Sequence, residues 1–274
     1  MRLGERVYDL TEHALVMGIL GAPPDVDALL RAATQLVADG ADLLEVGGGD
    51  SRCCDPEGLV TAVGALRERF DVPLAVVSGS GAVARAGFRA GAVMACSWGG
   101  CARDVLAAVA GAGATVVLGS GGASGGAAGG GGAEAEEVIA AIAAGARRAE
   151  EAGVAGDRIV LDPGLDLRRA PGYSRALLRA GPASRRLVGL GYPVVLTAGA
   201  AGASPIPAEA GPAAAAAAGA SPIPAEAALG VVLGCRIVRT EDVLGARHAC
   251  DVIAAILEAE PREARASVVL GAHR

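Results

Sequence analysis

Two residue types are missing from this chain of 274 residues: it contains no lysine and no asparagine, so all 24 of its basic Lys or Arg positions are arginine. A mechanism that needs a lysine amine or an asparagine amide is therefore excluded at every position. Aromatic residues are also scarce, at 2% of the chain, although hydrophobic residues make up 52%. Alanine, valine, leucine and isoleucine must therefore build the core.

Basic clusters and long apolar runs are missing as well. Acidic residues outnumber basic ones by 30 to 24, giving a net charge of −6, and no stretch combines arginines with aromatic residues. We therefore expect no nucleic-acid partner. No apolar run reaches the roughly 18 residues of a membrane span, and residues 1–12 lack the apolar segment of a signal peptide. These features predict a cytoplasmic protein without a membrane partner.

The cysteines show none of the spacings typical of metal sites. No two form a C-x-x-C pair, and none lies near a histidine at zinc-ligand spacing. We therefore predict reduced thiols and no metal site; Cys96 alone, at the end of a predicted strand, keeps a possible role in a site. The six positions are Cys53, Cys54, Cys96, Cys101, Cys235 and Cys250.

The stretch from Ile159 to Asp166 organises the rest of the chain. A short apolar run ends at Asp162, and Pro163 and Gly164 then force a turn. This pattern is typical of a buried parallel strand whose following loop carries function. An amphipathic helix is predicted before it, at 133–152, and the alternation of strand and helix continues toward both ends of the chain.

Eight strand–helix units can be read in this way, which favours a closed (β/α)8 barrel, a TIM barrel of the α/β class, forming a single domain over 1–274. A doubly wound open sheet is the alternative. The predicted strands cover 14–20, 43–46, 73–77, 92–96, 115–118, 159–166, 194–197 and 236–239. The predicted helices follow them, from Asp25 as a helix cap to Gly40, and at 56–70, 80–89, 103–110, 133–152, within 174–190, and at 225–233 and 242–258.

Two segments of biased composition interrupt this pattern. Nine of the fourteen residues in 119–132 are glycine, which predicts a flexible loop because glycine loses the most entropy on ordering. Residues 200–224 form an Ala/Pro-rich insert, in which the nine-residue unit Gly-Ala-Ser-Pro-Ile-Pro-Ala-Glu-Ala occurs at 202–210 and begins again at 219. Two copies do not make a repeat protein, so a local duplication in a surface connection is expected.

In a barrel, the loops after the strands form the functional face. The carboxylates Glu45 and Asp162 would face this mouth, as would the guanidinium groups of Arg52, Arg169 and Arg239. A carboxylate there can accept two parallel hydrogen bonds from an amidine-like ring edge, as in a pterin or a guanine, and arginines suit phosphate. Ion pairs that tie the strand ends together are the alternative interpretation.

Several motifs resemble those of the dihydropteroate synthases, over about residues 15 to 257. They are Met17-Gly18-Ile19-Leu20 with Pro24-Asp25, Val46-Gly47-Gly48 with Ser51-Arg52, Leu161-Asp162-Pro163-Gly164, Gly191-Tyr192-Pro193-Val194 and Arg239-Thr240-Glu241-Asp242-Val243. The resemblance implies a (β/α)8 fold and a transferase of folate biosynthesis. Such an enzyme displaces pyrophosphate from a pterin with 4-aminobenzoate, assisted by Mg²⁺. The resemblance also implies a homodimer formed through the last helices.

The chain departs from the family pattern at most of the positions that carry this chemistry. Relative to the family, Gly21 replaces the Asn that contacts metal and pyrophosphate. Cys96 and Ser97 replace the Asn-Asp pair that binds the pterin, and Ala200 and Ala201 replace an Arg-Lys pair. The other replacements are Glu45 and Val77 for Asp, Gly49 for Glu, and Ser120 and Glu241 for His. No catalytic residue can be named, and Mg²⁺ is expected only if synthase activity survives.

Three hypotheses follow. The first is a dihydropteroate-synthase-like barrel that has lost activity but binds a pterin or pterin pyrophosphate weakly; Trp98-Gly99-Gly100 and the altered fifth loop resemble the divergent, inactive second paralogue of actinobacteria. The second is an active synthase with rearranged contacts, and the third is a related barrel that binds a methylfolate for methyl transfer. The candidate substrate-binding residues are Asp162, Arg52, Ser51, Arg239, Glu45 and Cys96.

Overall fold

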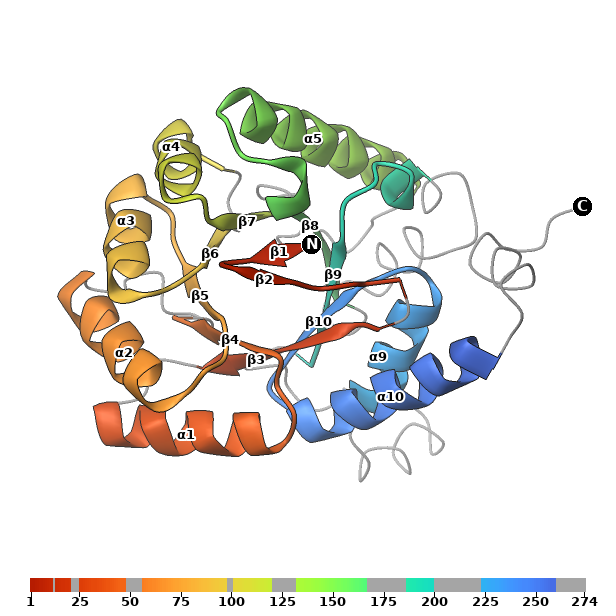
Figure 1. Cartoon of the computed structure of the whole chain (residues 1–274). Helices are drawn as coiled ribbons and strands as arrows, with labels where there is room; N and C mark the ends of the chain where they lie inside the picture. The colour runs from red at the N-terminus through yellow and green to blue at the C-terminus, as the bar shows by residue number, and fades with distance from the viewer. Residues whose placement is uncertain are drawn as a thin grey trace, which may run out of the picture.

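Eight parallel strands close into a barrel with helices packed around it in the computed structural model (Figure 1). The structure describes residues 1–11, 13–20, 25–47, 56–97, 101–119, 132–166, 186–199 and 223–259. Around the barrel the strand order is β10-β3-β4-β5-β6-β7-β8-β9. The predicted barrel is thus confirmed, and the open sheet is not the fold.

The element bounds lie close to the predicted ones. The barrel strands are β3 (Leu15–Leu20), β4 (Leu43–Val46), β5 (Leu74–Val77), β6 (Met94–Ser97), β7 (Thr115–Gly119), β8 (Ile159–Asp166), β9 (Val194–Ala198) and β10 (Ile237–Thr240). The helices are α1 (Val26–Ala38), α2 (Pro56–Arg69), α3 (Gly81–Ala90), α4 (Arg103–Ala112), α5 (Gly132–Glu151), the short 3₁₀ helix η1 (Gly156–Arg158), α9 (Ile223–Val232) and α10 (Val243–Ala259). Residues 120–131 of the predicted flexible loop 119–132, residues 200–222 of the insert 200–224 and most of the helix predicted within 174–190 fall outside the described residues.

Local signals in the sequence account for several of these boundaries. Asp25 caps α1, as predicted, because its Oδ1 accepts a hydrogen bond of 2.7 Å from the backbone N–H of Ala28. Ser80 caps α3 in the same way, accepting from the backbone N–H of Val83 at 3.3 Å. Gly91 ends α3 with a φ of 113°, a conformation that glycine adopts without strain. Polar caps and a terminal glycine thus place two of the helices.

The core consists of two layers separated by the sheet. Successive side chains of a strand point to opposite faces, so alternate residues fill the barrel and the others pack under the helices. The inner layer is one apolar cluster of buried residues: Leu3, Leu15, Met17, Leu43, Ala75, Met94, Cys96, Val117, Val160, Val195 and Ile237. Two outer clusters lie between the strands and the helices, one of them under α4 and α5.

An N-terminal hairpin closes the barrel at the end where the strands begin. Its strands, β1 (Arg2–Leu3) and β2 (Arg6–Val7), pair antiparallel and cross the barrel opening in Figure 1. Leu3 is 1% exposed and joins the inner cluster. The backbone is anchored by the Thr115 hydroxyl, which donates to the carbonyl of Arg2 at 2.6 Å, and by Arg158, which donates to the carbonyl of Gly4 at 3.1 Å. The sequence analysis assigned no strand here.

Candidate functional site at the barrel mouth

Four of the six predicted site residues lie at one level inside the barrel, near the ends of their strands: Glu45 on β4, Cys96 on β6, Asp162 on β8 and Arg239 on β10. Each follows by two positions an inward apolar residue of the inner cluster. These preceding residues are Leu43, Met94, Val160 and Ile237. Because side chains alternate along a strand, the four site residues share the inward direction of these neighbours.

Glu45 and Arg239 form a bidentate ion pair across the mouth. The Arg239 Nε donates to Glu45 Oε2 at 3.0 Å, and its Nη2 donates to Glu45 Oε1 at 2.6 Å. Glu45 is fully buried, and the Arg239 side chain is 12% exposed. The two residues are 194 positions apart in the chain. The alternative interpretation in the sequence analysis, an ion pair tying strand ends together, therefore describes Glu45, whose two oxygens are already bound.

The surroundings of Arg239 keep its guanidinium charged. Burial by itself would lower the pKa of this group. The charge and hydrogen bonds of Glu45, with the charge of Asp162, outweigh that effect and raise the pKa of Arg239 above its usual value. Among the described residues, the carboxylates of Glu45 and Asp162 therefore both act on the guanidinium of Arg239.

Asp162 is held in place by the turn that follows it. Its Oδ1 accepts a hydrogen bond of 2.7 Å from the backbone N–H of Gly164, which has a φ of 75°. This left-handed backbone conformation favours glycine, which explains why Gly164 stands at this position of the turn. The pairing of β8 with β9 shifts between Leu161 and Leu165, so the turn bulges out of the ladder. Asp162 is 3% exposed, and its carboxylate is thus fixed at the mouth.

Cys96 is a neutral thiol in this site. It is fully buried, and burial, reinforced by the negative charge of Glu45, raises its pKa well above the ordinary value. A thiolate is the reactive form of cysteine, so Cys96 is poorly suited to act as a nucleophile. It can fill space beside Glu45 and donate a weak hydrogen bond.

Further buried polar residues lie at the same end of the barrel, and they are not among the site residues predicted from the sequence. Ser78 and Ser97 are each 3% exposed, and Thr240 is fully buried. Ser78 donates to the carbonyl of Ser80 at 2.6 Å, and Thr240 accepts from the backbone N–H of Asp242 at 3.1 Å. Their position directly at a strand end is the signal that could have identified them.

The remaining two predicted residues, Ser51 and Arg52, lie outside the described residues, as does Arg169. Among the residues that the structure describes, no three Asp, Glu, His or Cys side chains come together as a metal site would require. Both oxygens of Glu45 are bound by Arg239, and Gly21 has no side chain to offer a ligand. Among the described residues, the mouth thus does not bring together the several oxygen ligands that Mg²⁺ prefers.

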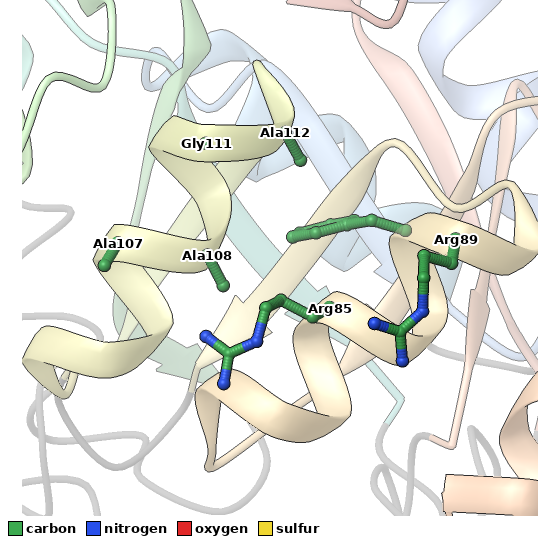
Figure 2. A pocket seen from close by; sticks show the side chains of 7 residues that line it. Arg85, Arg89, Ala107, Ala108, Gly111 and Ala112 are labelled. Atoms are coloured by element: carbon green, nitrogen blue, oxygen red, sulfur yellow. The ribbon is translucent and has the colours of Figure 1, made fainter.

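Two hollows elsewhere do not share these features. One, of about 420 Å³, lies between α3 and α4 on the outside of the barrel, with Arg85 and Arg89 beside the small side chains of α4 (Figure 2). The other, of about 610 Å³, lies near Met1 and Tyr192 at the end where the strands begin. Neither is lined by any of the four mouth residues. The mouth therefore remains the candidate site.

Comparison with known proteins gives the mouth a family context. The sequence profile of the family described as pterin binding enzyme matches residues 20–239, more than half of the chain. The chain belongs to the pterin-binding enzyme family. The matched range begins at the end of β3 and closes on Arg239, so it contains all four mouth residues.

Individual members of the pterin-binding enzyme family resemble the chain over nearly its whole length. The dihydropteroate synthase of Streptococcus pyogenes is 26% identical over 266 residues, covering 89% of this chain and 95% of the relative. The structure of dihydropteroate synthase from Thermus thermophilus in complex with 6HMPPP is 27% identical, with a TM-score of 0.72, and 93% of this chain and 98% of that one are covered. For the Xanthomonas albilineans enzyme the identity is 25% and the TM-score 0.74, with coverages of 93% and 97%.

No helix in the described part of the chain is long and apolar enough to cross a bilayer.

Proposed function

We propose that this protein is a dihydropteroate-synthase-like barrel that has lost synthase activity and binds a pterin weakly at Asp162. The observation that carries the proposal is the contrast at the mouth. Asp162 keeps a buried, turn-fixed carboxylate, whereas the positions around it have lost the groups that would read a pterin and release pyrophosphate. The sequence Trp98-Gly99-Gly100 resembles that of the inactive second paralogue of actinobacteria, which supports the proposal.

The retained carboxylate suits a pterin ring. The 2-amino group and the neighbouring ring nitrogen of a pterin form an amidine-like edge with two parallel donors, which a carboxylate binds in two-point fashion. Asp162 lies buried at the mouth, and the turn that follows it fixes its carboxylate. A ligand that offers such an edge would therefore orient on Asp162.

The lost contacts argue against catalysis. At Cys96 and Ser97 the family pattern has an amide and a carboxylate, but here a neutral buried thiol and a hydroxyl take their places. A hydrogen bond to a charged group contributes about 1.5–3 kcal/mol, so the loss of two such bonds in the transition state lowers the rate about 10²- to 10⁴-fold. The exposed Glu241 adds a negative charge just after β10, where the family has a histidine that helps bind pyrophosphate.

The experiment is a calorimetric titration with 6-hydroxymethyl-dihydropterin pyrophosphate, with and without Mg²⁺, followed by a turnover assay with 4-aminobenzoate. We expect weak binding and no dihydropteroate. Asp162→Ala should weaken binding at least about tenfold, because the two-point contact is lost. Asp157→Ala removes a carboxylate from η1 at the opposite end of the barrel and serves as the matched control. Formation of dihydropteroate would favour the active synthase instead. The pterin site would be refuted if neither this ligand nor unphosphorylated 6-hydroxymethyl-dihydropterin bound at millimolar concentration.

We further propose a homodimer formed through the last helices. Four large apolar side chains are exposed there: Leu229 on α9 at 46%, and Leu244, Val252 and Ile256 on α10 at 46%, 58% and 53%. Positions 244, 252 and 256 repeat at multiples of four, so they lie along one side of α10. Ile256→Glu should convert the dimer to a monomer in light scattering, whereas Val60→Glu on α2 should not. A monomeric wild type would overturn this proposal.

A further inference from the structure

Arg239 is already engaged before any ligand arrives. A guanidinium has five N–H donors in a rigid fork, and the Nε and Nη2 groups of Arg239 both point at Glu45, with bonds of 3.0 and 2.6 Å. Glu45 is fully buried, so water cannot take over either bond. The positive charge that this arginine could offer to a phosphate is thus largely cancelled by a carboxylate in direct contact with it.

The length of the acidic side chain makes this pairing possible. Glu45 lies on β4 and Arg239 on β10, and β3 lies between these two strands in the barrel. The carboxylate must therefore reach across a neighbouring strand to meet the guanidinium in two-point geometry. A glutamate has one methylene more than the aspartate that the family resemblance leads one to expect at this position, and both of its oxygens make the contact.

The charge balance disfavours an anionic ligand at this level. Glu45 and Asp162 are negative, Arg239 is positive, and burial strengthens electrostatic interactions because water is excluded. A diphosphate would bring further negative charge next to these carboxylates, and Glu45 already holds Arg239 with two hydrogen bonds. A neutral amino-heterocycle brings only N–H donors, which Asp162 can accept.

We propose that Glu45 determines the ligand class of this site. By neutralising Arg239, it makes the mouth select an unphosphorylated pterin over the pterin pyrophosphate that a synthase uses. This inference rests on the proposed function, because it assumes that a pterin binds at Asp162. It deepens that function by naming a residue and a substrate class: a neutral, amidine-bearing heterocycle without a diphosphate group.

The test compares the affinities of two ligands, 6-hydroxymethyl-dihydropterin and its pyrophosphate, in the wild type and in Glu45→Gln. The wild type should bind the pyrophosphate no more tightly than the unphosphorylated pterin. Glu45→Gln keeps the size of the side chain and one acceptor for Arg239 but removes the charge. It should raise the affinity for the pyrophosphate at least about tenfold relative to the pterin.

The controls separate a specific effect from a general one. Glu68→Gln makes the same chemical change on the exposed outer side of α2 and should leave the ratio of affinities unchanged. Thermal unfolding shows whether Glu45→Gln is folded. If it is not, Glu45→Asp is used, which shortens the side chain, breaks the two-point contact and should shift the ratio in the same direction by a smaller factor.

Three outcomes overturn the proposal. The first is a wild type that prefers the pyrophosphate by about tenfold or more, and the second is a folded Glu45→Gln whose ratio does not change. If neither pterin binds the wild type, the proposed function fails, and inorganic pyrophosphate alone then tests the role of Glu45. In that case Glu45→Gln should bind inorganic pyrophosphate more tightly than the wild type does, and equal binding is the third overturning outcome.

Discussion

The two ends of the barrel are closed by different chemistry. At the end where the strands begin, the hairpin of β1 and β2 inserts Leu3 into the apolar inner cluster. Its partly buried polar contacts are made to its backbone, and its Arg2 and Arg6 side chains form exposed ion pairs with Asp157 and Asp71. At the end where the strands finish, the same inward direction carries Glu45, Asp162 and Arg239. In the described part of the chain, five of the seven buried polar residues lie at this second end: Glu45, Ser78, Ser97, Asp162 and Thr240.

This difference shows that buried charged groups are concentrated at the mouth. Apolar filling of a barrel end stabilises the fold directly, because it removes hydrophobic surface from water. Burial of charged groups costs desolvation energy that an ion pair only partly returns. A barrel that served stability alone could carry apolar residues at both ends. The charged residues at the mouth are therefore better explained by a ligand than by folding.

The largest expected effect comes from removing one half of the mouth ion pair. Glu45→Ala leaves the Arg239 guanidinium buried without this carboxylate, and the free energy of unfolding should fall by about 3–5 kcal/mol. Urea denaturation followed by circular dichroism measures the change. The double variant Glu45→Ala/Arg239→Ala should recover part of the loss because the stranded charge is also gone. If the free energy of unfolding of Glu45→Ala lay within about 1 kcal/mol of the wild-type value, the ion pair would be more accessible to water than the structure indicates.

The second prediction concerns the opposite end. Leu3→Ala should lower the free energy of unfolding by about 2–4 kcal/mol, because it leaves a cavity in the inner cluster. Ligand affinity at the mouth should stay the same, since the hairpin lies at the end of the barrel where the strands begin (Figure 1). Val7→Ala, at a position that is 69% exposed in the same hairpin, is the control and should cost less than about 0.5 kcal/mol. Loss of pterin binding in a folded Leu3→Ala would contradict this separation of the two ends.

The smallest expected effect compares the buried thiols at the two ends. Burial raises the pKa of Cys235, just before β10, to about 12, and burial raises the pKa of Cys96 at the mouth well above its ordinary value. The unfolded chain loses these protons first, near the ordinary thiol pKa of about 8.5. Stability is therefore complete below that pH and falls above it, by about 1.4 kcal/mol per pH unit for each thiol.

Denaturation curves between pH 8 and pH 10 measure this decline. Cys235→Ala and Cys96→Ala should each reduce the loss of stability per pH unit, and by similar amounts, because both thiols are buried from water. A Cys96→Ala variant with the same slope as the wild type would indicate that water reaches Cys96 at the mouth and not Cys235 at the other end.

The strand–helix alternation was predictable from residue patterns alone. Apolar runs bounded by turn residues located all eight barrel strands, and Asp25 was correctly predicted to cap α1. The hairpin of β1 and β2 was missed because strands of two residues have no periodicity to detect. The stretch 159–166 was predicted as the sixth strand, with a turn at Pro163 and Gly164; pairing with β9 keeps the chain in the sheet beyond that turn.

The positions of the candidate site residues followed from their places at strand ends, but the contacts between them did not.

The sequence by itself determined the chemistry available to this protein: a barrel core of small apolar residues, no lysine or asparagine, and a carboxylate at Asp162 followed by a turn. Only the tertiary structure decided that Glu45 meets Arg239, 194 positions away. The physical reason is that an ion pair depends on distance in space, and the closure of the barrel places β10 next to β3 and within reach of β4.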